Sequence, residues 1–128
     1  MMILKRHAHW LLRLAVASIF LYHGSGKFFD PQGAAAMLAL PLALTVIVAL
    51  CETVGSFLVL LGGLDLSRGI ITRLGCILIL PVILGAALTK HWGQWSFLPS
   101  QTHPMGGVEF HAVILVILLY LLIRGKEV

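Results

Sequence analysis

The stretch Leu42–Gly63, LALTVIVALCETVGSFLVLLGG, decides the fold of this chain. Pro41 precedes it, paired glycines close it, and Glu52 is its single charged residue. About 20 apolar residues in a helix cross the hydrocarbon core of a bilayer. A helix also satisfies its own backbone hydrogen bonds, as a lipid-facing segment must. The stretch therefore predicts a transmembrane helix with one carboxyl group near its middle.

Three further apolar segments of similar length flank this one, at residues 10–29, 69–90 and 108–125. None of them alternates between apolar and polar residues, which disfavours a β-barrel. We therefore predict an all-α integral membrane protein, a four-helix bundle with spans at about 10–29, 42–63, 69–90 and 108–125. With 128 residues there is no room for a second domain beside these spans, so we expect residues 1–128 to form a single transmembrane domain.

The composition agrees with a membrane protein and disfavours other classes. Hydrophobic residues make up 59% of the chain and charged residues 11%, whereas about a quarter of a soluble domain is charged. The lysines and arginines give a formal net charge of +4 but are scattered, without the basic stripe of a nucleic-acid-binding protein. Cys51 and Cys76 stand alone, and no cysteine–histidine group has zinc spacing, so we expect no metal site.

Lysine and arginine are concentrated on one side of the predicted spans. They lie in the N-terminal segment, after the second span and in the C-terminal segment, whereas the first and third connections have only Lys27 and Lys90 at their edges. Because short cytoplasmic connections are enriched in these residues, we expect both termini to face the cytoplasm. Trp92 and Trp95 then lie at the outer interface, where aromatic residues gather.

In this orientation, ionisable residues gather in the outer half of the bundle. At about 1.5 Å per residue, Glu52 lies about 15 Å deep, near the bilayer centre. An acidic residue there costs on the order of 3 kcal/mol to insert, and such residues face the protein interior. Helical spacing puts Glu52 on one face with Thr45, Ala49 and Ser56, which predicts that this face is buried. The predicted ligand-binding cluster consists of His23, Lys27, Glu52, His91, Glu109 and His111.

Depth also suggests which of these groups pair. Lys27 and Glu109 lie at similar depths on the first and fourth helices, so we expect them to form an ion pair. Glu52 lies about 10 Å deeper than Lys27, and its expected neighbour is His23. We therefore expect Glu52, together with His23, to be the titrating and ligand-facing site.

A second set of basic residues, Arg13, Arg68 and Arg73, lies on the inner side. We expect the side chains of Arg13 and Arg73 to reach the lipid headgroups, as long basic side chains near helix ends do. Arg13 also shares a helical face with Gly24 and Lys27. A small residue on such a face lets a neighbouring helix approach closely.

The order of these residues resembles the DoxX family of small four-helix membrane proteins. The similar parts are LRLAVASIFLYHGSGKF with Arg13, Gly24 and Lys27, CETVGSFLVLLGGL with Glu52, Gly55 and Gly62, Arg68 before the third helix, AALTKH with His91, and GGVEF with Glu109. The resemblance implies a multi-pass protein of the bacterial inner membrane, tied to thiol, thiosulfate and quinone redox chemistry. Its expected partners are the lipid bilayer and a membrane-associated oxidoreductase. Homo-oligomerisation stays open, and a quinone is the candidate cofactor.

Three functions stay open at this point, and with them the question whether the chain is itself an enzyme. The first is a membrane component of a redox or oxidative-stress-related assembly that binds a quinone or a small anion in the outer half. The second is a small proton-coupled transporter in which Glu52 carries the proton. The third is a non-catalytic scaffold or assembly factor whose polar residues only hold the helices together. A thiol-oxidising enzyme is disfavoured, because that chemistry needs paired cysteines.

Overall fold

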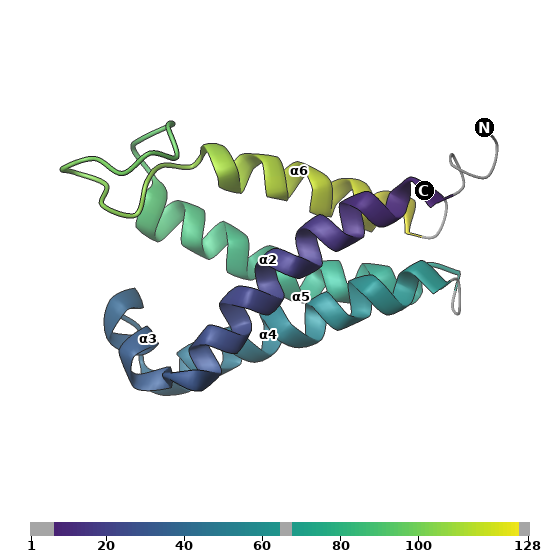
Figure 1. Cartoon of the computed structure of the whole chain (residues 1–128), viewed down its shortest axis with the longest axis horizontal. Helices are drawn as coiled ribbons and strands as arrows, with labels where there is room; N and C mark the ends of the chain where they lie inside the picture. Colours follow the sequence, from purple (N-terminus) through teal and green to yellow (C-terminus); the bar gives the residue numbers. More distant parts are fainter. Residues whose placement is uncertain (1–6, 65–67, 126–128) are drawn as a thin grey trace.

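The computed structural model describes residues 7–64 and 68–125, which form helices and the connections between them, without any strand (Figure 1). The α-helices are α2 (His9–Phe29), α3 (Pro31–Leu38), α4 (Leu42–Leu61), α5 (Ile70–Ala86) and α6 (Glu109–Arg124). A 3₁₀ turn, η1 (Gly62–Leu64), follows α4, and a π-helix, η2 (Ala87–His91), follows α5. The prediction of an all-α chain is confirmed, and a helix occupies each of the four predicted ranges.

Within the described residues, two helical segments are long and apolar enough to cross a membrane. They are Leu42–Leu64, with a mean hydropathy of 2.3, and Ile70–His91, with a mean hydropathy of 2.2. α2 has 21 residues but includes Arg13 and Lys27. α6 has 16 residues, about 24 Å of helix, against a hydrocarbon core of roughly 30 Å. The two segments that meet both the length and the hydropathy criterion for crossing a membrane are therefore the two in the middle of the chain.

α3 is a helix that the sequence interpretation did not anticipate. Asp30 is its N-cap, with a carboxylate oxygen that accepts the Gly33 N–H at 2.9 Å, and Pro31 takes the first helical position. Ala39 ends the helix in the left-handed conformation, with φ of 51°. No residue of α3 is buried, so it is a short surface helix at one end of the molecule.

α4 packs against both α2 and α5. Gly55 of α4 faces Gly75 of α5, and a Cβ atom on Gly75 would lie only 2.6 Å from the Gly55 carbonyl oxygen. The two backbones can approach this closely because neither glycine has a side chain. The predicted burial of one α4 face is confirmed, since Thr45, Ala49, Glu52 and Ser56 are all buried.

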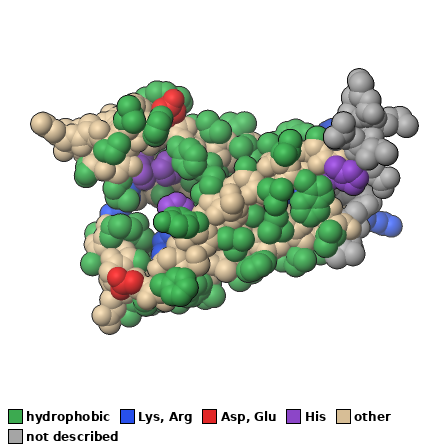
Figure 2. All heavy atoms as spheres, viewed as in Figure 1, with side chains coloured by type: hydrophobic (Ala, Val, Ile, Leu, Met, Phe, Trp, Pro, Cys, Tyr) green, Lys and Arg blue, Asp and Glu red, His purple; other side chains and the backbone are tan. Residues whose placement is uncertain are grey.

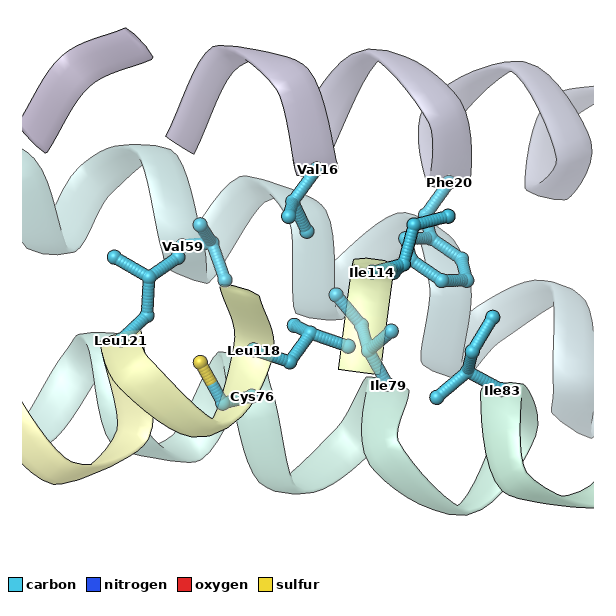
Figure 3. Close-up of a cluster of buried hydrophobic side chains, with 9 residues drawn as sticks. All are labelled: Val16, Phe20, Val59, Cys76, Ile79, Ile83, Ile114, Leu118 and Leu121. Atoms are coloured by element: carbon cyan, nitrogen blue, oxygen red, sulfur yellow. The ribbon is translucent and has the colours of Figure 1, made fainter. Parts of the chain in front are cut away.

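The apolar core packs residues 16–20 of α2 and residue 59 of α4 against residues 76–83 of α5 and 114–121 of α6 (Figure 3). Four helices contribute to it: its members are Val16, Phe20, Val59, Cys76, Ile79, Ile83, Ile114, Leu118 and Leu121. Beyond this core, α2, α3 and α4 diverge from α5 and α6. The core therefore holds one end of the bundle together while the other end opens.

Candidate functional site

A cleft of about 1050 Å³ lies at the open end of the bundle. In Figure 2 it is a notch between two lobes, with histidine and basic side chains on its wall. Residues of α2, α3 and α4 line one side, and residues of α5, η2, the 92–108 connection and α6 line the other. Most of the lining is apolar with a few polar groups, which is typical of small-molecule sites.

An ion pair between α2 and α4 lies in the wall of this cleft. Nζ of Lys27 donates to the two carboxylate oxygens of Glu52, at 2.7 and 3.0 Å, and to the His23 carbonyl oxygen at 3.2 Å. The side chains of Lys27 and Glu52 are only 11% and 5% exposed. Gly24 makes room for this contact, because a Cβ atom there would lie 3.1 Å from the Ala49 carbonyl oxygen on α4. Each of the three ammonium donors has an acceptor, so the pair is closed.

The observed ion pair contradicts the expected pairing of Lys27 with Glu109. Helical Cα–Cβ bonds tilt towards the helix N-terminus, and α2 and α4 run in opposite directions. The side chains of Lys27 and Glu52 therefore lean towards each other and close the difference in depth. Glu109, in the first turn of α6, leans towards the 92–108 connection, where its Oε2 accepts the Phe97 N–H at 3.2 Å. Backbone depth along each helix does not predict this pair, because the direction of the side chains sets the distance between the charged atoms.

Three histidines from three elements share the cleft with this ion pair: His23 of α2, His91 of η2 and His111 of α6. The rings of His91 and His111 are in contact, with centroids 4.0 Å apart and planes tilted by 39°. Nδ1 of His91 lies 2.9 Å from the Gly106 carbonyl oxygen, and it must be the donor because a carbonyl only accepts. In the neutral ring, Nε2 of His91 is therefore the acceptor.

Five residues of the predicted cluster line the cleft: His23, Lys27, Glu52, His91 and His111. Glu109, the sixth, binds the loop backbone instead. In the part of the chain that the structure describes, no group of three or more histidine, cysteine, aspartate or glutamate residues is arranged to hold a metal ion. The cleft therefore offers a closed ion pair and hydrogen-bonding imidazoles, set in apolar walls.

Arg13 forms a separate polar site at the opposite end of the core, where it is completely buried. Nη1 donates to the Val59 carbonyl at 2.7 Å and to Oγ1 of Thr72 at 2.8 Å. Nη2 donates to the Gly125 carbonyl at 2.8 Å, and Nε donates to Nδ1 of His9 at 3.0 Å. The expectation that this side chain reaches the lipid headgroups is wrong. The two carbonyls lie at the C-terminal ends of α4 and α6, where the helix dipole favours a positive charge.

The other two inner-side arginines also lie at helix ends and not in the cleft. Nε and Nη2 of Arg73 donate to the carbonyls of Leu122 and Ile123, at 3.2 and 3.4 Å, near the end of α6. Arg68 is exposed and has φ of 50°, two residues before α5 begins. Arg73 therefore contacts the C-terminal end of α6.

Thr72, η2 and α3 were missed by sequence reasoning. Nothing in the pattern distinguishes Thr72, which is buried beside Arg13, because threonine is unremarkable in an apolar helix. The π-helix of η2 is a local backbone feature of a kind often found at functional sites, and it has no sequence signal. The start of α3 does have a sequence signal, because Asp30 followed by Pro31 is an N-cap pattern.

Comparison with known proteins gives one result. The DoxX family model matches residues 8–92, which run from the start of α2 to the end of η2 and include Lys27, Glu52 and His91. No curated protein and no solved structure matches the chain. The matched residues make up more than half of the sequence, and they contain both partners of the ion pair in the cleft. This chain therefore belongs to the DoxX family.

Proposed function

We propose that this protein is a membrane component of a redox or oxidative-stress-related assembly in the bacterial inner membrane. In this proposal, its cleft binds a lipophilic redox molecule of the quinone class. The observation that carries the proposal is the cleft itself, about 1050 Å³ of mainly apolar space beside Lys27, Glu52 and three histidines. This volume is slightly above the usual range of roughly 300–1,000 Å³ for small-molecule sites, which suits a ring with the start of a hydrocarbon chain.

The proposal includes four membrane crossings, by α2, α4, α5 with η2, and α6, with both termini in the cytoplasm. The hydrogen bond from Arg13 to Gly125 supports this topology, because it joins the first turns of α2 to the end of α6. At the other end of the molecule, Trp92 and Trp95 are 68% and 65% exposed, as interfacial tryptophans are. The cleft then lies in the outer half of the bundle.

The imidazoles supply the chemistry that a quinone needs. A neutral ring nitrogen accepts a hydrogen bond from a quinol hydroxyl, and a protonated one donates to a quinone carbonyl. A neutral imidazole carries one nitrogen of each kind, so a single ring can donate to a quinone or accept from a quinol. In this proposal, His91 and His111 bind the polar ring, and a membrane-associated oxidoreductase exchanges electrons with it.

Two alternatives differ in how they account for the ion pair. A proton-coupled transporter needs Glu52 free for a proton or a cation, but both of its carboxylate oxygens are bound by Lys27. A non-catalytic scaffold is consistent with the ion pair and with the Arg13 contacts, because both connect helices. The scaffold is therefore the second candidate.

Mass spectrometry of the protein purified in mild detergent, with its bound small molecules and proteins, tests the proposal. We expect a quinone to copurify with the wild type, to be lost from His111→Leu and to be retained in the control Arg124→Lys. Absence of quinone from the wild type contradicts the proposed ligand. If an oxidoreductase then still copurifies with a Glu52→Gln, Glu109→Gln double variant, the scaffold is the better description.

A further inference from the structure

We propose that the cleft opens sideways into the outer leaflet, and that its ligand is an uncharged amphiphile that enters from the lipid and not from water. The inference rests on the proposed function for the ligand site and for the orientation in the membrane. It adds the route of entry and the charge of the ligand. Three features of the cleft carry it: its rim, its charges and its open flanks.

The rim of the cleft is apolar on both sides. Six aromatic or methionine residues of the lining are also exposed, from 43% for Met105 to 90% for Phe29. They are Tyr22, Phe29 and Met37 on one side, and Phe97, Met105 and Phe110 on the other. Exposed apolar surface costs about 25 cal/mol per Å² in water. Immersion of the rim in lipid removes that cost.

The charged groups of the cleft favour an uncharged ligand. Lys27 and Glu52 neutralise each other, and the Asp30 carboxylate caps α3 through the Gly33 N–H. The Lys27–Glu52 pair offers no net charge to a charged headgroup, whereas a hydroxyl or carbonyl group needs only a hydrogen bond to an imidazole. Lys90 also lines the cleft, at the end of η2, where a long basic side chain can reach the lipid headgroups.

The flanks of the cleft face the region where acyl chains lie. α2 and α6 diverge towards the open end, and the notch passes between the two lobes (Figures 1 and 2). The cleft extends to Glu52, about halfway along α4. A notch of that depth in the outer half of a bundle is bordered by lipid and not only by water. α3, with no buried residue, lies at the rim as an interfacial helix would.

Tryptophan quenching tests immersion of the rim without any ligand. Trp10, Trp92 and Trp95 are replaced by phenylalanine, and one tryptophan is introduced by Phe29→Trp or Phe110→Trp. In phosphatidylcholine vesicles with brominated acyl chains, we expect at least half of this fluorescence to be quenched, with little quenching by aqueous iodide. The matched control is Gln101→Trp in the exposed part of the 92–108 connection, where iodide should quench and brominated lipid should not. Stronger quenching by iodide than by lipid at both rim positions overturns the proposal.

Loading kinetics test the route of the ligand. The probes are a methylnaphthoquinone ring with a long hydrocarbon chain and the same ring without it, and the readout is quenching of the tryptophan in Phe110→Trp. We expect Met37→Glu at the rim to slow loading of the chain-bearing probe from vesicles about tenfold relative to the protein without this substitution. Ala36→Glu, on the same helix but outside the cleft lining, is the control.

The outcomes separate the route from the function. If the chainless ring loads as fast as the chain-bearing one, and Met37→Glu changes neither rate, the lipid route is wrong and the ligand site stands. If neither probe binds, the quinone class of the proposed function fails, and the quenching experiment still decides whether the rim lies in the leaflet.

Discussion

At the scale of single residues, Arg13 shows how a buried charge can be stabilised without a carboxylate. Its guanidinium contacts the ends of α4 and α6, a side chain of α5, and His9 one turn earlier on α2. We predict that Arg13→Lys lowers the free energy of unfolding by about 3 kcal/mol, because an ammonium group cannot reach these separate acceptors and leaves some unpaired. Thermal unfolding in detergent measures this. Arg124→Lys, at an exposed position, is the control and should change little.

Glu52 and Glu109 have different roles, and the same substitution separates them. Glu52→Gln leaves the ammonium of Lys27 buried without its partner, so we expect a loss of about 3 kcal/mol in the free energy of unfolding. Glu109→Gln weakens one hydrogen bond to the Phe97 N–H, so we expect a loss of about 1 kcal/mol or less. A Lys27→Met, Glu52→Gln double variant should recover part of the stability, because no unpaired charge remains. Equal effects of the two single substitutions would argue against the Lys27–Glu52 pair.

At the scale of elements, the contact between α4 and α5 depends on paired glycines. A Cβ atom on Gly75 would lie 2.6 Å from the Gly55 carbonyl oxygen and 2.8 Å from the Val59 nitrogen, so Gly75→Ala must separate the helices. We expect a cost of about 1–3 kcal/mol, measured by thermal unfolding. Gly85→Ala on the same helix meets no atom within 4 Å and should stabilise the protein by up to about 1 kcal/mol through helix propensity. A destabilising Gly85→Ala would contradict this account.

At the scale of the whole molecule, the orientation determines what the cleft can bind. α3 and the 92–108 connection lie at one end, and the start of α2 and the end of α6 lie at the other (Figure 1). With both termini cytoplasmic, a fluorescent reporter fused after Val128 should fluoresce, and alkaline phosphatase inserted after Gln101 should be active. An active phosphatase at Val128 would place the cleft in the inner half and exclude entry from the outer leaflet.

The sequence by itself predicted the four long helices and five of the residues that line the cleft, but not α3 or the π-helix η2. Apolar length predicts the long helices, because a helix needs only local hydrogen bonds and about 20 apolar residues to cross lipid. Helical spacing also predicted the buried face of α4 around Glu52. The polar residues gather because ionisable side chains within apolar helices turn towards the protein.

Only the tertiary structure decided which of these groups are partners. Lys27 meets Glu52 because Gly24 lets α2 approach α4 and because the two side chains lean towards each other along antiparallel helices. Arg13 is buried because the ends of α4 and α6 meet around it and supply its acceptors. Such contacts depend on side-chain direction and on helix separation to within a few ångströms. Positions along a single helix determine neither, because both are set by packing between residues far apart in the chain.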